Sequence, residues 1–242
     1  MSDSSARESA TSGFGETFAG WCALVAIVLF YLAMGPGFGF IPPLSPLLSA
    51  EDFARHYSER AVAVRIGSVM LMTGAALMFP LFGAMSAAML RMKGRPLALS
   101  ATQLGTAIVT FAPLFMSSFF FAAASFREER AAADVLALSD VGWFFLVMPT
   151  PAVLIQLVVF GIAILGDDKA RPVFPRWLAY FNFWVGVLFF AGVFIPIFKT
   201  GPFAWDGLLA FWIPFLVFGL WIAVMAWQFI RLGGQPARGE RS

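Results

Sequence analysis

The chain has 242 residues, of which 60% are hydrophobic and only 12% are charged, and its net charge at pH 7 is +2. Soluble domains average about 45–50% apolar and about 25% charged residues, so this composition excludes an ordinary soluble protein. A single histidine and a single cysteine exclude bis-histidine haem, three-histidine zinc and cysteine metal clusters. We therefore expect no metal site and no cofactor, and the few basic residues, confined to loops and tails, do not indicate nucleic-acid binding.

The apolar residues occur in long segments separated by short charged clusters. Residues 1–16 are polar and rich in serine, which is typical of a disordered tail. Because a helix needs about 20 apolar residues to cross a bilayer, the remainder predicts an all-α, polytopic transmembrane helical bundle over residues 17–232, followed by a C-terminal tail over 233–242. The expected spans are six, over residues 18–40, 61–90, 97–124, 141–165, 177–198 and 203–230.

The lysines and arginines predict an orientation. Ten of them fall in the two tails and in the segments that join spans two to three and four to five, whereas six fall on the other side. Because basic residues favour the cytoplasmic side, we expect both termini in the cytoplasm and the segments after spans one, three and five on the outer face.

SAEDFARHYSER, residues 49–60, precedes the second span and contains the only histidine. Ser49 followed by Asp52 is a capping pattern that starts a helix, and apolar residues recur at helical spacing after it. We expect an amphipathic helix at the outer interface. His56 could act as a proton donor, or it could be a structural residue beside a carboxylate. The candidate acid–base residues of the outer side are Asp52, His56, Glu59 and Asp206.

Few polar residues lie within the spans. Gln103, Gln156 and Asn182 are amides in spans three, four and five, and such groups either bind a ligand or hold helices together by hydrogen bonds. Aromatic residues make up 17% of the chain, and Trp184 and Trp212 fall deep within spans. They either pack between helices or line a pocket for an apolar ligand. These five residues are the candidate ligand-binding residues.

Three segments carry a resemblance to a known family: FIPPLSPLLSAEDFARHY, PVFPRWLAYFNFW and FKTGPFAWDGLLAFW. With them the chain resembles a family of six-span integral membrane proteins of actinobacteria and proteobacteria, to which no activity has been assigned. The resemblance implies six spans and the bacterial cytoplasmic (inner) membrane, and it supplies no catalytic residue.

Three functions are compatible with the sequence. The first is a membrane protein that binds a lipid or other apolar ligand, alone or as an accessory subunit that joins partner membrane proteins in a lipid-handling assembly. The second is a membrane enzyme that acts on a lipid or isoprenoid at the outer face. The third is a small-solute transporter, which the lack of internal repeats and of charged residues in mid-span disfavours.

Overall fold

The computed structural model describes the backbone of residues 2–235 and the side chains from residue 13 onward. This part of the chain is helical and contains no β-strand. Six segments are long and apolar enough to cross a membrane, which confirms the predicted all-α bundle of six spans: Gly13–Gly37, Ala61–Met89, Leu97–Phe126, Ala132–Gly166, Arg176–Phe194 and Leu208–Gly233.

Several spans consist of more than one helical element. The first joins α1 (Ser2–Leu32) to the π-helix η1 (Ala33–Gly37), and the last joins the π-helix η3 (Leu208–Trp212) to α9 (Ile213–Gly233). The remaining elements are the short helix α2 (Ala50–Glu59), then α3 (Ala61–Leu77), α4 (Phe79–Met89), α5 (Leu97–Phe126), α6 (Ala132–Val147), α7 (Thr150–Gly166), α8 (Arg176–Phe189) and the 3-10 helix η2 (Phe190–Phe194).

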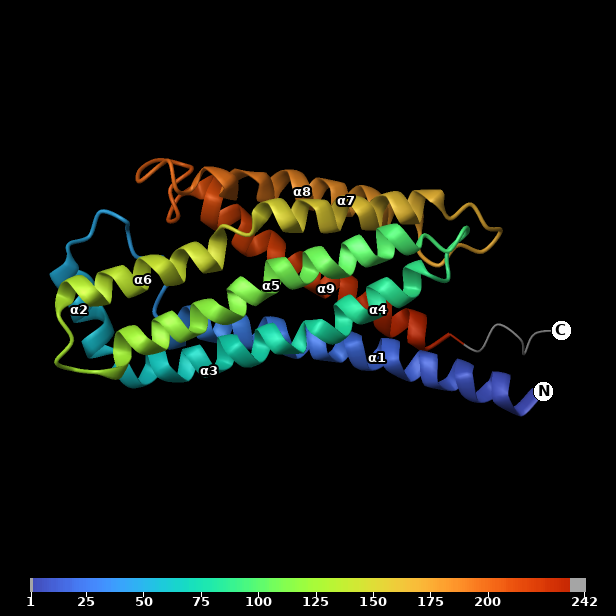
Figure 1. Cartoon of the computed structure of the whole chain (residues 1–242), viewed down its shortest axis with the longest axis horizontal. Helices are drawn as coiled ribbons and strands as arrows, with labels where there is room; N and C mark the ends of the chain where they lie inside the picture. The colour runs from blue at the N-terminus through green and yellow to red at the C-terminus, as the bar shows by residue number, and fades with distance from the viewer. Residues whose placement is uncertain (1, 236–242) are drawn as a thin grey trace.

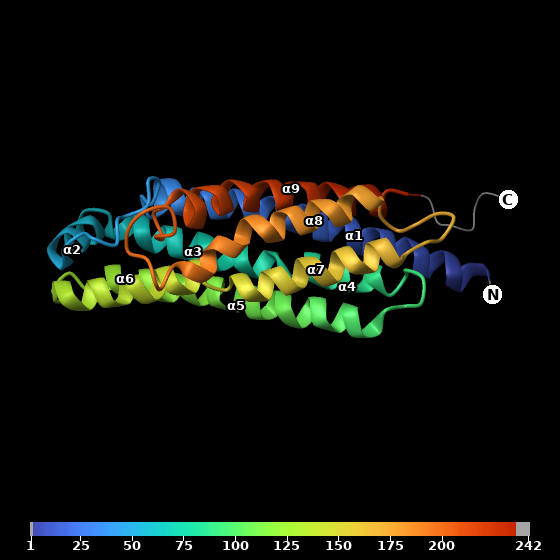
Figure 2. The same cartoon turned by 90° about the horizontal axis from the view of Figure 1, so that it is seen from above.

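The six spans form a ring in chain order. Each span packs on the next along the chain, through α1 with α3, α3 and α4 with α5, α5 with α6 and α7, α7 with α8, and α8 with α9. The extensive contact between α1 and α9 closes the ring. Figures 1 and 2 show the spans running along the long axis of the molecule, with the start of α1 and the end of α9 at the same end.

Ion pairs and hydrogen bonds join the loops at the end where α1 starts. The buried carboxylate of Asp167 accepts hydrogen bonds from the main-chain N–H groups of Lys93 (3.0 Å) and Val173 (2.8 Å). The Lys93 ammonium lies 2.7 Å from Asp168 and holds the pKa of that carboxyl below its usual value. The two loops, which join α4 to α5 and α7 to α8, are thereby tied together.

The first span starts earlier than the sequence predicts. Residues 2–16, expected as a disordered tail, belong to α1. Two contacts fix the end of this stretch: Glu16 forms an ion pair with Arg91, and Gly13 lies so close to Gly233 that an added Cβ would be 2.8 Å from the Gly233 carbonyl oxygen. The expected C-terminal tail lies outside the described residues from residue 236 onward.

The fourth span also starts earlier, at Ala132 rather than at residue 141. The charged stretch before residue 141 is helical because its other face is buried on α2. Val135 and Ser139 are buried, and the Tyr57 hydroxyl donates a hydrogen bond to Ser139 Oγ at 3.0 Å. The sixth span starts later, since residues 203–207 form turns ahead of η3.

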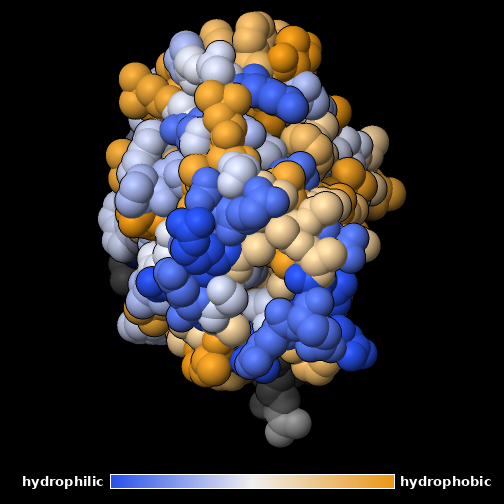
Figure 3. Space-filling model, turned by 90° about the vertical axis from the view of Figure 1, so that its left-hand side faces the viewer, coloured by the Kyte–Doolittle hydropathy of each residue, from blue (hydrophilic) through white to orange (hydrophobic). Residues whose placement is uncertain are grey.

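The end of the molecule that carries α2 combines polar and apolar surfaces. Hydrophilic side chains gather there between hydrophobic flanks (Figure 3). Ser49 caps α2 as predicted, because its Oγ accepts a hydrogen bond from the Asp52 N–H at 3.1 Å. The helix buries Phe53 and Tyr57 and exposes its charged face, which fits an amphipathic helix.

Candidate functional site

Helix α2 holds the end of the first span. The Nε2 atom of His56 lies 2.7 Å from the carbonyl oxygen of Phe38, and the Arg60 guanidinium donates to the carbonyl of Pro36 at 2.9 Å. Because a carbonyl only accepts, His56 carries a proton on Nε2. Carbonyls at the end of a helix lack intrahelical donors. His56 and Arg60, which are one helical turn apart at the end of α2, supply donors to these carbonyls and so cap the C-terminal end of η1.

The other acid–base candidates have different surroundings. Asp52 is engaged by Ser49 and lies 3.2 Å from Arg55. Glu59 is exposed on α2, and Asp206 lies half-buried in the turns before η3. Among the described residues, no hydrogen bond or ion pair joins His56, Glu59 and Asp206 to one another, and no group of three His, Cys, Asp or Glu residues could hold a metal ion.

The burial of His56 predicts a pH dependence of stability. Burial lowers the pKa of His56, the Phe38 carbonyl partly opposes this, and Arg60 lowers the pKa further. A pKa below the usual value of about 6.5 means that the unfolded state binds a proton more readily. Charging the partly buried imidazole therefore costs stability: the protein has its full stability above about pH 6.5 and loses part of it as the pH falls through the pKa of His56 in the folded state.

We expect the melting temperature of the purified protein to fall between pH 7.5 and pH 5, and to fall less in His56→Gln. The glutamine amide retains a donor for the Phe38 carbonyl but does not titrate. Melting curves of both proteins over this pH range in the same detergent provide the measurement. An identical pH dependence of the melting temperature in the two proteins would show that His56 is not the group responsible.

The amides within the spans have three different environments. Gln103 accepts a hydrogen bond from Ser86 Oγ at 2.5 Å and so joins α5 to α4. Asn182 accepts a hydrogen bond from Trp221 Nε1 at 3.0 Å and donates to the carbonyl of Leu178 at 2.7 Å. Gln156 is fully buried in α7, and neither its Nε2 nor its Oε1 has a partner.

The two tryptophan candidates lie away from the centre. Trp184 is 49% exposed on α8, and Trp212 is half-buried in η3. Neither lines the cavity described next. Trp221, which was not among the candidates, does line it.

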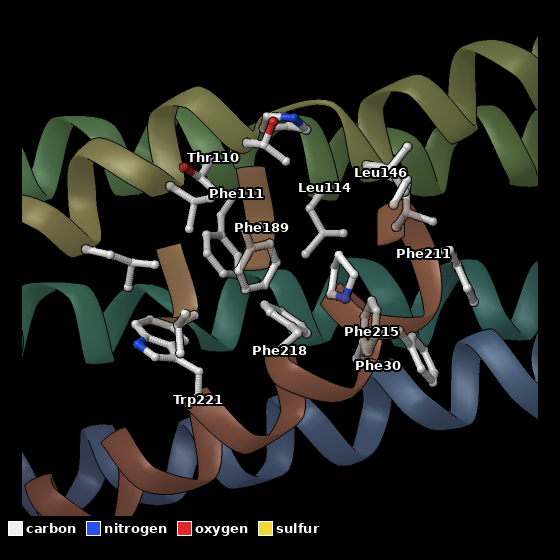
Figure 4. Close-up of a pocket in the computed structure, with 18 of the residues that line it drawn as sticks. Phe30, Thr110, Phe111, Leu114, Leu146, Phe189, Phe211, Phe215, Phe218 and Trp221 are labelled. Carbon is white, nitrogen blue, oxygen red and sulfur yellow. The ribbon is translucent and has the colours of Figure 1, made fainter. Parts of the chain in front are cut away.

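An apolar cavity of about 110 Å³ lies within the ring. All six spans except the second contribute to its wall. Figure 4 shows Phe111 and Leu114 of α5, Phe189 of α8 and Phe218 of α9 directed toward a common space. The full lining is Phe30, Met34, Thr110, Phe111, Leu114, Leu146, Val147, Pro149, Thr150, Val153, Leu157, Val185, Phe189, Ala210, Phe211, Pro214, Phe215, Phe218 and Trp221.

Aromatic contacts fix the wall of this cavity. Phe30 and Phe218 meet edge to face at 5.0 Å between ring centroids, and the Tyr31 hydroxyl donates to the carbonyl of Phe215 at 2.8 Å. On the opposite side of α9, the hydrogen bond to Asn182 orients the Trp221 indole. A wall held by such contacts is preformed, as in most small-molecule sites.

The cavity coincides with interruptions of the helices. Met34 comes from η1, and Ala210 and Phe211 come from η3. Residues in π-helices make up well under 1% of proteins and often occur at functional sites. Pro149, at the break between α6 and α7, also lines the cavity. Irregular backbone at membrane depth occurs where it is buried in protein or lines a cavity.

Comparison of the chain with models of protein families, with curated proteins and with solved structures finds no match. The geometry of the site is therefore the basis for a functional proposal.

Proposed function

We propose that this protein binds a lipid or other apolar ligand within the membrane, in the cavity at the centre of the ring. The observation that carries the proposal is the cavity itself: it is apolar, it lies within the spans, and two π-helices and a proline break form parts of its wall. An engineered apolar cavity of about 150 Å³ stays dry and binds benzene. A cavity of about 110 Å³ would hold one small ring or the end of a chain.

Membrane lipids are the natural source of such a ligand, and an accessory role beside partner membrane subunits is compatible with it. Catalysis at the outer face has less support, because His56 is engaged in capping η1, and among the described residues no hydrogen bond or ion pair joins it to Asp52, Glu59 or Asp206. We also propose that both termini face the cytoplasm, since more basic residues lie on their side. The family resemblance supports a bacterial cytoplasmic (inner) membrane.

A cavity-filling substitution should remove the ligand. Val153 lines the cavity and is 9% exposed, so Val153→Phe places a ring into the space that the ligand would occupy. We expect native mass spectrometry of the wild-type protein, extracted from its own membrane in mild detergent, to show a stoichiometric lipophile. Val153→Phe should retain at most about a tenth as much, a loss of about 1.4 kcal/mol in binding free energy.

Val69→Phe is the matched control, because Val69 on α3 is 58% exposed and lies outside the cavity. It should retain the lipophile as the wild type does, and both variants should keep a cooperative melting transition. Equal retention in Val153→Phe, or a wild-type protein that carries no lipophile, would refute the proposal. A partner chain retained without a lipid would instead assign the function to that assembly.

A further inference from the structure

The last carbonyl groups of α6 have lost their regular partners. In a continuous helix, the carbonyls of Phe145, Leu146 and Val147 would accept from the N–H groups of residues 149, 150 and 151. Pro149 and Pro151 have no N–H, and the Thr150 N–H donates to the Met148 carbonyl at 2.7 Å. Three successive acceptors therefore lack these donors at the middle of the span Ala132–Gly166.

A second hollow lies on the lipid-facing side of the same break. This groove, of about 540 Å³, is lined by Val109, Pro113, Val141, Phe144, Phe145, Met148, Pro149, Pro151 and Ala152. Val109, Phe144 and Met148 are exposed. Pro113 removes the regular donor to the Val109 carbonyl in the same way. Within the membrane, this exposure places the groove in contact with lipid.

Pro149 lines both hollows, so the α6–α7 break is the wall between them. Phe145 belongs to the groove, whereas Leu146 and Val147 belong to the cavity. The carbonyls that lack donors thus belong to residues of this wall. The Val147 oxygen lies close to η2, where a Cβ at Gly192 would be 3.2 Å from it, so Phe145 and Leu146 are the carbonyls nearest to a path from the groove into the cavity.

The polar side chains of the cavity already have partners. Thr110 donates to the Thr106 carbonyl at 2.8 Å, and Thr150 lies 3.4 Å from the Met148 carbonyl. The Trp221 N–H is bound to Asn182. The donors of these side chains are therefore in use, and the two threonine hydroxyls keep only acceptor capacity. The α6 carbonyls add acceptors that have no donor at all, so the site as a whole favours a ligand that donates a hydrogen bond.

We propose that the ligand is a lipophile with a hydroxyl group, such as a phenol or alcohol with an apolar tail. Its ring or chain end occupies the cavity, its hydroxyl donates to the carbonyls at the end of α6, and its tail lies in the groove facing lipid. This inference rests on the proposed function and adds the chemical class of the ligand. An unpaired polar group at membrane depth is costly, so a donor that pairs with it is strongly favoured.

The test compares two probes that differ in the donor alone. Radiolabelled para-nonylphenol and its methyl ether are equilibrated with the wild-type protein in lipid nanodiscs, and nanodiscs with Val153→Phe serve as the blank. We expect the phenol to bind about tenfold more tightly than the ether, in line with one hydrogen bond to an otherwise unpaired acceptor.

The double variant Pro149→Ala with Pro151→Ala restores N–H donors for Phe145 and Val147. Because Pro149 and Pro151 line the hollows, binding of both probes can change, and the readout is the ratio of phenol to ether binding within the variant. We expect this ratio to fall close to one. Pro80→Ala, at the break between α3 and α4 and outside both hollows, is the control and should keep the preference.

Equal binding of the two probes by the wild type would overturn the inference while leaving an apolar ligand in place. Displacement of the phenol when Na⁺ replaces choline in the buffer would also overturn it, because the carbonyls would then serve a cation. Failure of the proposed function itself is distinct, since it appears as a wild-type protein that carries no lipophile from its own membrane.

Discussion

Replacing Trp143 with alanine is expected to lower the free energy of unfolding by about 3–5 kcal/mol, the usual range for a buried large aromatic side chain. Trp143 is completely buried in α6. The centroid of its ring lies 4.8 Å from that of Phe40. It stacks on Trp205 with 5.8 Å between the ring centroids and an interplanar angle of 9°. Trp205 in turn donates to the Leu44 carbonyl at 2.8 Å, so the substitution also loosens the loop after the first span.

Unfolding titrations in mixed micelles of a mild detergent and sodium dodecyl sulfate would measure this change. Trp143→Phe should cost less than the alanine variant, because the indole N–H of Trp143 has no hydrogen-bond partner to lose. Trp177→Ala is the matched control, since Trp177 is 45% exposed on α8, and its effect should stay below about 1 kcal/mol. A similar loss in both alanine variants would refute the role assigned to Trp143.

Gly67→Leu should destabilise the protein by about 3 kcal/mol, at the upper end of the range for overpacking a filled interface. A Cβ at Gly67 would lie 3.1 Å from the Gly37 Cα and 3.2 Å from the Phe38 ring. The neighbouring atoms on one side are backbone, which cannot rotate away. Helices α3 and η1 would have to separate, and the end of η1 would move away from His56 and Arg60.

The same substitution at Gly105 is the control, because nothing lies within 4 Å of a Cβ at that position on α5. We expect Gly105→Leu to melt within a few degrees of the wild type, whereas Gly67→Leu should melt far lower. Equal melting temperatures would show that the close approach of α3 to η1 tolerates a side chain.

The architecture could be predicted from the sequence because the membrane imposes it. A helix must have a minimum length to cross a bilayer, so segments such as 61–90 and 97–124 can be recognised as spans from their length and hydropathy alone. The errors occur where a helix continues beyond the apolar segment. The start of α6 carries Asp134 and Asp140, yet Val135 and Ser139 are buried and Ser139 is hydrogen-bonded to Tyr57 of α2. This contact cannot be predicted from the local composition.

The cavity could not be predicted in the same way. It is lined by residues of eight helical elements and one break between helices, and no spacing along the chain brings Phe30, Val153 and Phe218 together. Gln103 and Asn182 were candidate ligand-binding residues because they are polar residues within spans. In the structure their side-chain amides form hydrogen bonds between helices. Prolines within the spans are the feature of the sequence that coincides with the cavity, since Pro149 and Pro214 line it.

The partner of His56 could not be predicted from its local sequence. A lone histidine between two carboxylates resembles an acid–base group, whereas its ring faces the end of another span. That partner, Phe38, lies 18 positions earlier, in a segment that glycines and prolines make irregular, so its position depends on the tertiary fold.

Because the first and last spans contact each other directly, the packing of the ring does not require the chain to start at the first span. A linker from Gly233 to Gly13, with the chain opened in the exposed loop between Arg127 and Arg130, would give a circular permutant that retains the helix contacts of the ring. Its termini would emerge on the opposite side of the membrane. The packing of the helices therefore does not determine on which side of the membrane the termini lie; the order in which the loops connect the helices does.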